Sequence, residues 1–315
     1  MKVLLTGGSG QVGQKILKSK PKEIEIINPS RDKLDLSDHS ACKQIVEDHK
    51  PDWIINCGAY TQVDDAEKNI QLSHKINSYA PAAFVEAINN KNTNLLHIST
   101  DFVFDGNQNF PYKENQIRKP LSQYGSSKAL GEELIEKKIN NIEQATILRT
   151  SWVISPIGKN FILTMLKLHS EREIIKVVSD QIGCPTSAKE LAKVCWRIIE
   201  LKKKKKLPFI FHWSDAGVAS WFDIALAVGE LAKELGIIKK EASVLPINTS
   251  DYPTPAQRPK YSLLNTQNTA NVLDINPIHW RKNLRNILHL PLIKLLRVLQ
   301  TANQKLFWEE LVRVV

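Results

Sequence analysis

The stretch VLLTGGSGQVGQKIL, residues 3–17, decides the fold. A short apolar run leads into a glycine-rich turn and then into apolar residues at helical spacing, and Gly7, Gly10 and Gly13 form a G-x-x-G-x-x-G pattern. The first glycine of such a turn permits the tight bend, the second lets the backbone approach a pyrophosphate, and the third lets the helix pack against the strand. Because the pattern follows the first strand and opens the first helix, it predicts a dinucleotide site there, with a purely structural turn as the alternative.

Further apolar runs follow at 24–27, 53–57, 95–98 and 146–151, and stretches with helical periodicity separate them. Nearly continuous hydrophobicity is typical of strands covered on both faces, and strand–helix alternation predicts a parallel sheet with crossover helices. We therefore expect an α/β fold with a doubly wound, Rossmann-type, mostly parallel sheet.

The regular alternation of strand and helix patterns ends at about residue 150. Turn formers dominate 156–190, residues 221–236 have the pattern of an amphipathic helix, and 246–266 hold four prolines in a polar background. We expect an NAD(P)-binding domain over 1–150, with later segments returning to it, and a smaller, mainly substrate-binding α/β lobe over 151–290. The stretch 291–315 predicts a C-terminal helical tail that packs on its own chain or on a second subunit, which would make a homodimer.

Composition excludes several classes of function. Of the 315 residues 42% are hydrophobic, enough for a core, yet no run of about 18 apolar residues predicts a membrane span. The net charge is +10, but the basic run LKKKKKL at 201–207 contains no aromatic residues, so we expect a solvated loop and no nucleic-acid partner. The four cysteines form no C-x-x-C pair, which predicts reduced thiols in a cytoplasmic protein.

The end of the second strand predicts which dinucleotide binds. An NAD-type site usually has an acidic residue there for the ribose 2′-hydroxyl, whereas this chain reads Asn28, Pro29, Ser30 and Arg31. Neutral and basic groups favour the 2′-phosphate of NADPH over NADH, unless Arg31 is simply a surface arginine. Asp35 and Leu36 follow where the adenine ring would lie.

The segment SQYGSSKALGEEL, residues 122–134, places Tyr124 and Lys128 four residues apart at a predicted helix start. Helical spacing puts both side chains on one face. A lysine charge about 4 Å away contributes about 4 kcal/mol at an effective dielectric near 20, which would lower the tyrosine pKa from about 10 to about 7. Thr100, at the end of the strand in LLHISTDFVFDG, is placed to supply a hydroxyl to a carbonyl oxygen.

Together these motifs resemble the dTDP-4-dehydrorhamnose reductase family of the extended short-chain dehydrogenase/reductases. The resemblance spans about residues 1–290 and rests on GGSGQVG, NCGAYTQVDDAE (56–67), STDFVFDG (99–106), YGSSK (124–128), LRTSWV (148–153), DQIGCPT (180–186) and YPTPAQRP (252–259). It implies an NADPH-dependent reduction of the C4 ketone of dTDP-4-dehydro-β-L-rhamnose, a nucleotide sugar, which yields a precursor of cell-surface polysaccharide.

The resemblance also implies roles for individual residues. Gly10, Gln11 and Val12 would line the cofactor phosphates, and Ala59, Tyr60 and Thr61 would lie along the dinucleotide. Tyr124 and Lys128 would be the catalytic pair, assisted by Thr100. Thr100, Asp101 and Trp152 would face the deoxysugar, and Arg258 would bind the diphosphate.

The sequence departs from the family pattern at two places, and two alternative functions stay open. The tail is longer than the family pattern, and Lys15 occupies the place where some relatives use a glutamate on the first helix to bind Mg²⁺, so we expect no metal there. A non-catalytic NADP-binding regulatory subunit of the same fold is one alternative, and a reductase or epimerase of another nucleotide sugar is the other. The set Thr100, Tyr124 and Lys128 favours catalysis.

Overall fold

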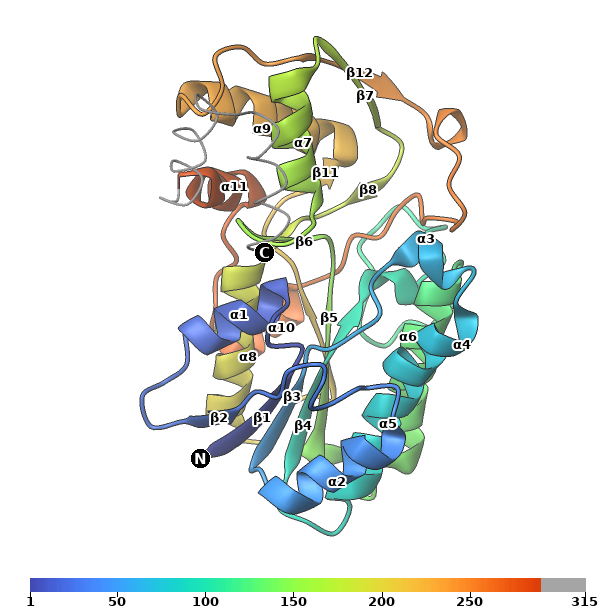
Figure 1. The fold of residues 1–315 in the computed structure, drawn as a ribbon, viewed down its shortest axis with the longest axis vertical. Helices are drawn as coiled ribbons and strands as arrows, with labels where there is room; N and C mark the ends of the chain where they lie inside the picture. Colours follow the sequence, from blue (N-terminus) through green and yellow to red (C-terminus); the bar gives the residue numbers. More distant parts are fainter. Residues whose placement is uncertain (290–315) are drawn as a thin grey trace.

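The computed structural model describes residues 1–289, which fold around a six-stranded parallel sheet (Figure 1). The strand order is β10-β5-β4-β3-β1-β2, and every pair in it is parallel. The strands are β1 (Lys2–Thr6), β2 (Glu25–Ile27), β3 (Trp53–Asn56), β4 (Asn94–Thr100), β5 (Ala145–Thr150) and β10 (Ile210–Trp213). The predicted doubly wound, Rossmann-type sheet is confirmed.

Helices cover both faces of this sheet (Figure 1). One layer contains α1 (Gln11–Lys18), α8 (Ala188–Lys202) and α10 (Gln267–Leu273); the other contains α2 (His39–His49), α5 (Ala80–Ile88) and α6 (Gln123–Lys138). Each layer buries its own apolar cluster against the sheet. The chain leaves β1 for β2 on one side and returns to β3 on the other, so the sheet's topological switch point lies between β1 and β3.

Short helices connect the larger elements. Those that follow the carboxyl ends of β3 and β4 are α3 (Val63–Ala66), α4 (Ile70–His74), the π-helix η1 (Lys75–Tyr79) and the 3₁₀-helix η2 (Asp101–Val103), whereas the 3₁₀-helix η3 (Ile142–Gln144) directly precedes β5. The α3, α4 and η1 segments pack against α6, which positions that helix beside the switch point.

A second apolar cluster, built from residues between Ile154 and Leu288, lies above the sheet in Figure 1. Its elements are α7 (Phe161–Glu171), α9 (Trp221–Glu234), α11 (Trp280–Leu288), η4 (Thr249–Asp251) and three two-stranded sheets. The sheets pair β6 (Val153–Ile154) with β9 (Thr186–Ser187), β7 (Ile174–Val178) with β12 (Ser243–Ile247), and β8 (Ile182–Gly183) with β11 (Ala219–Ser220). Because β10 belongs to the central sheet and α8 and α10 pack on it, the chain beyond residue 150 contributes to both parts. No helix within residues 1–289 combines the length and apolarity needed to cross a bilayer. The predicted tail at 291–315 lies outside the described residues.

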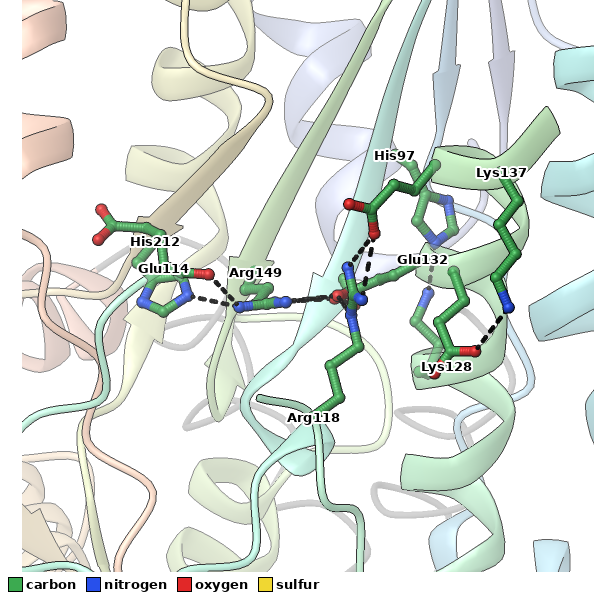
Figure 2. Close-up of polar contacts among 11 residues, drawn as sticks. His97, Glu114, Arg118, Lys128, Glu132, Lys137, Arg149 and His212 are labelled. Carbon is green, nitrogen blue, oxygen red and sulfur yellow. Dashed lines mark hydrogen bonds and ion pairs between the residues drawn. The ribbon is translucent and has the colours of Figure 1, made fainter. Parts of the chain in front are cut away.

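A buried ion pair holds α6 on the sheet (Figure 2). The Glu132 carboxylate, fully buried, accepts hydrogen bonds from Arg149 Nη2 of β5 at 2.6 Å and from Arg118 Nε at 2.6 Å. It also accepts one from the Ser99 hydroxyl of β4. Burial opposes its ionisation, but the charges and hydrogen bonds of the two arginines prevail and lower the pKa of Glu132 to about 2. The carboxylate therefore stays charged and fully hydrogen-bonded.

We expect Glu132→Ala to reduce the free energy of unfolding by about 3–5 kcal/mol, because it leaves the buried guanidinium of Arg149 without its carboxylate. Urea unfolding followed by circular dichroism measures the change. Glu133→Ala is the matched control: its neighbouring carboxylate is 41% exposed and pairs with Lys137 on the surface, so it should cost less than about 1 kcal/mol. Equal losses in the two variants would contradict a structural role for the buried pair.

Candidate active site

A cavity of about 640 Å³ opens at the carboxyl ends of the central strands, beside the switch point. The glycine-rich turn between β1 and α1 forms one wall. Gly7 has a φ of 66°, and a side chain on Gly13 would place Cβ 2.2 Å from the Gly7 carbonyl oxygen. Only glycine fits at these positions, so the turn keeps its backbone close to the cavity.

The structure brings the residues predicted for the cofactor onto the wall of this one cavity. They are Gly7, Gly10, Gln11, Val12, Gly13, Arg31, Asp35, Leu36, Ala59, Tyr60, Thr61, Tyr124 and Lys128. Between the end of β2 and Arg31 there is no acidic side chain. The backbone N–H of Ser37 lowers the pKa of Asp35, so this acid is charged near the predicted adenine position.

Helix α6 presents Tyr124 and Lys128 to the cavity. Its first turn is fixed by the Ser122 hydroxyl, which accepts from the Gly125 N–H at 3.1 Å, and by Glu67, whose carboxylate accepts from the Gln123 N–H at 2.8 Å. The ammonium of Lys128 donates to the carbonyl oxygen of Ile98 in β4 at 2.7 Å. Two neighbouring elements therefore hold the pair that the sequence singled out.

The electrostatics of this pair differ from the sequence-based expectation. Burial raises the pKa of Tyr124 to about 12; the charge of Asp101 raises it further, and the Thr100 hydroxyl partly opposes the shift. Burial also lowers the pKa of Lys128 to about 8. The prediction that Lys128 lowers the tyrosine pKa to about 7 is therefore wrong in direction, because desolvation of the phenolate raises that pKa. Tyr124 is protonated at neutral pH.

Thr100 ends β4 on the cavity wall, whereas its neighbour Asp101 lies behind that wall. The Thr100 hydroxyl donates to Asp101 Oδ1 at 3.0 Å and accepts from the Phe102 N–H at 3.2 Å. Asp101 is 1% exposed; burial raises the pKa of this carboxyl to about 6, and the side chains of Ser262 and Thr100 partly oppose the shift. Asp101 thus contacts Thr100, and its predicted contact with the sugar stays a prediction.

Aromatic side chains from the second part of the chain form the opposite wall. The rings of Trp152 and Trp221 stack with centroids 3.8 Å apart and planes inclined by 14°, and Phe161 packs on Trp221 at 4.7 Å. Gln11, the first residue of α1 after the glycine-rich turn, accepts hydrogen bonds from the Ser155 hydroxyl at 2.8 Å and the Asn160 amide at 3.1 Å. These contacts join the two walls directly.

Arg258 lies outside the cavity wall. Its guanidinium pairs with both carboxylate oxygens of Asp64, at 2.7 and 3.0 Å, and the Asp64 pKa is lowered by this hydrogen bonding. The pair ties the proline-rich loop to the segment that follows β3. The predicted phosphate ligand is thus engaged by a carboxylate in this structure.

Sequence reasoning missed several wall residues of the second part, among them Lys159, Asn160, Phe161 and Trp221. The segment SPIGKNF showed only turn formers, and Trp221 showed only as the start of an amphipathic helix. Neither signal indicates a shared cavity, because these residues are separated from the glycine-rich turn by about half of the chain or more.

Across residues 1–289, no three side chains of His, Cys, Asp or Glu gather closely enough to hold a metal ion. Lys15 lies on α1, and burial lowers the pKa of its ammonium. The expectation of no Mg²⁺ at this place stays a prediction.

A dinucleotide turn at the switch point, with a tyrosine and lysine on the facing helix, defines an NAD(P)H-dependent oxidoreductase of the short-chain dehydrogenase/reductase type. The family model described as RmlD substrate binding domain matches residues 1–291. A dTDP-4-dehydrorhamnose reductase of Aggregatibacter actinomycetemcomitans is 36% identical over 290 residues, covering 91% of this chain and 98% of that protein. The chain belongs to the dTDP-4-dehydrorhamnose reductase family, as predicted.

Solved structures agree with this assignment. A dTDP-4-dehydrorhamnose reductase of Clostridium acetobutylicum has a TM-score of 0.83 at 33% identity, with coverage of 91% of this chain and 98% of that one. The enzyme of the same name from Bacillus anthracis, solved in complex with NADP, has a TM-score of 0.82 with the same identity and coverage.

We expect Gly13→Ala to weaken NADPH binding at least about tenfold, because the new methyl group would push the Gly7 carbonyl and the turn away from their positions. Quenching of tryptophan fluorescence by NADPH measures the affinity. Lys18→Ala, an exposed change in the same helix, is the control and should leave the affinity unchanged. Equal affinities for the Gly13 variant and the wild type would show that the turn does not hold the dinucleotide.

Proposed function

We propose that this protein reduces the C4 ketone of dTDP-4-dehydro-β-L-rhamnose with NADPH to give dTDP-β-L-rhamnose. The observation that carries the proposal is the single cavity in which the glycine-rich turn faces Tyr124 and Lys128. Membership of the reductase family supplies the substrate, and the relative solved with NADP supports the cofactor.

The residues present fit NADPH. The turn is a cradle that a Cβ on Gly13 would fill, and the N-terminus of α1 behind it suits a pyrophosphate. Arg31 would hold the 2′-phosphate, while Ala59, Tyr60 and Thr61 would lie along the dinucleotide. When bound, the reduced nicotinamide supplies the hydride.

Tyr124 would supply the proton. Reduction creates an alkoxide at C4, which is far more basic than a phenolate, so a tyrosine with a pKa of about 12 is protonated and still transfers its proton downhill. Thr100 would hydrogen-bond the carbonyl oxygen from the end of β4. A raised tyrosine pKa therefore suits the reductive direction.

Lys128 would hold the tyrosine and the nicotinamide ribose in position. With the Ile98 carbonyl and His97 Nε2 engaged, one N–H of the ammonium is left for the phenol and the ribose hydroxyls. As the phenol loses its proton, the nearby ammonium stabilises the phenolate.

The aromatic wall would receive the sugar. Trp152, stacked on Trp221, offers an apolar face to the deoxysugar and its methyl group. Arg258 stays our candidate for the diphosphate, which would have to compete with Asp64 for the guanidinium. Asp101 would act through Thr100, the residue that it contacts.

Two broader expectations belong to the same proposal. We place the enzyme in the cytoplasm, because all four cysteines are unpaired. A homodimer and the absence of Mg²⁺ stay predictions. The regulatory-subunit alternative is disfavoured because a binding module has no physical need for Thr100, Tyr124 and Lys128 on one cavity wall.

We expect the purified protein to oxidise NADPH when offered dTDP-4-dehydro-L-rhamnose, and Tyr124→Phe to lower kcat at least about 100-fold with little change in NADPH affinity. The loss follows from removal of the proton donor. Absorbance at the NADPH band measures turnover, and a panel of dTDP-, GDP- and UDP-4-ketosugars tests the substrate. Tyr79→Phe, at a tyrosine 44% exposed and away from the cavity, is the control. Full turnover by Tyr124→Phe would exclude this tyrosine as the donor.

We expect Arg31→Ala to weaken NADPH binding about tenfold and to leave NADH binding nearly unchanged, because only NADPH carries the 2′-phosphate. Fluorescence titrations with both cofactors measure the ratio. Lys33→Ala is the control: it removes a nearby positive charge from a residue that does not line the cavity. It should leave the ratio of NADPH affinity to NADH affinity unchanged. The same loss for both cofactors in the Arg31 variant would overturn the 2′-phosphate assignment.

A further inference from the structure

His97 is a buried titratable group that the proposed mechanism does not use, yet it contacts Lys128 (Figure 2). Its Nε2 atom lies 3.1 Å from Lys128 Nζ, and the two residues are 1% and 2% exposed. His97 comes from β4, immediately before Ile98, the other partner of the ammonium. Consecutive residues of one strand therefore fix Nζ from two directions.

A chain of hydrogen bonds continues from His97 across the sheet. His97 Nδ1 lies 3.0 Å from Asn56 Nδ2 at the end of β3, and Asn56 Oδ1 accepts from the Thr6 hydroxyl at the end of β1 at 2.6 Å. Thr6 in turn accepts from the Gly58 N–H at 3.1 Å. The chain thus runs from Lys128 to the strand ends that flank the glycine-rich turn.

Which atom donates in each hydrogen bond of this chain depends on whether Lys128 is an ammonium or a neutral amine. An ammonium can only donate, so His97 Nε2 must then accept, the ring proton sits on Nδ1, and the Asn56 amide turns over to present Oδ1 to the ring. A neutral amine can accept, so the ring proton moves to Nε2 and Asn56 presents its amide nitrogen. The Thr6 hydroxyl can rotate to accommodate either orientation. Every contact can be satisfied in both states.

We propose that His97 is a positioning residue for Lys128: its neutral imidazole accepts from the ammonium and donates to the amine, so that Nζ keeps one position in both protonation states. The proposal rests on the proposed function, in which Lys128 orients Tyr124 and the nicotinamide ribose. A fixed acceptor or an apolar side chain at residue 97 could satisfy at most one of the two states.

The surroundings leave Lys128 as the group that titrates near neutrality. Burial, with the Lys128 charge, keeps the pKa of His97 well below its usual value, so the ring is neutral. The other titratable or charged groups facing the pair are Tyr124 and Glu132 on α6, Cys57 after β3 and, beyond Glu132, Arg149 of β5. The pKa values of Tyr124 and Cys57 are raised to about 12, and that of Glu132 is lowered to about 2.

Two isosteric substitutions separate this role from a merely structural one. His97→Gln places an amide where Nε2 lies, so it keeps the Lys128 contact and can donate or accept. His97→Asn places an amide where Nδ1 lies, so it keeps the Asn56 contact and loses Lys128. The ammonium gains more from a charge-assisted hydrogen bond than the amine gains from a neutral one, so loss of the contact lowers the Lys128 pKa.

The experiment measures NADPH affinity and kcat against pH for the wild type and both variants. We expect the alkaline limb of His97→Asn to move down by about one pH unit and its kcat to fall about tenfold, with His97→Gln close to the wild type. Identical profiles for the two variants would overturn the proposal. If the wild type binds NADPH but does not reduce the keto-sugar, the proposed substrate is wrong, and the NADPH titration still tests His97.

A second measurement needs no variant. In the full-length wild-type protein labelled with ¹⁵N-histidine, we expect one buried neutral histidine to change from the Nδ1–H to the Nε2–H tautomer as the pH rises through the Lys128 titration. Nuclear magnetic resonance distinguishes the two tautomers by their nitrogen shifts. Constant tautomers for every histidine between about pH 6 and about pH 10 would contradict the proposal.

Discussion

The ion pair between Glu132 and Arg149 is the constraint on which the site depends. A buried carboxylate is costly unless its oxygens are satisfied, and two arginines and the Ser99 hydroxyl satisfy this one. The pair docks α6 onto β4 and β5 and fixes the rotation of this helix about its own axis. Because Lys128 lies one turn before Glu132 and Tyr124 lies one turn before that, the same rotation directs both side chains to their places.

The cavity forms where two separately packed parts of the chain meet. The glycine-rich turn and α6 belong to the sheet, while Trp152, Trp221 and Phe161 stand on the other apolar cluster. Gln11, bonded to Ser155 and Asn160, and Arg258, bonded to Asp64, span the junction. The dinucleotide wall and the aromatic wall are therefore held opposite each other by polar contacts, which suits a site where two ligands must meet.

The electrostatics of the site follow burial more than proximity. Tyr124 and Lys128 share a helix face, yet desolvation raises the pKa of the phenol and lowers that of the ammonium. The outcome favours a protonated tyrosine, which a reductase needs, over the phenolate that would suit the reverse reaction. The charge on Glu132 is held by its arginines, and it partly opposes the lowering of the Lys128 pKa by burial.

The sequence by itself determined the doubly wound sheet, the glycine-rich turn and the Tyr124–Lys128 pair, because strand periodicity, turn chemistry and helical spacing are local properties. Thirteen residues predicted for the cofactor, with Thr100 and Trp152, line one cavity, although their roles stay predictions. Only the tertiary structure placed Trp221 and Lys159 in that cavity, moved Asp101 behind Thr100, paired Arg258 with Asp64 and joined His97 to Lys128. Those contacts, and the pKa values that follow from burial, depend on segments far apart in the chain, and local patterns contain no information about which distant groups will become neighbours.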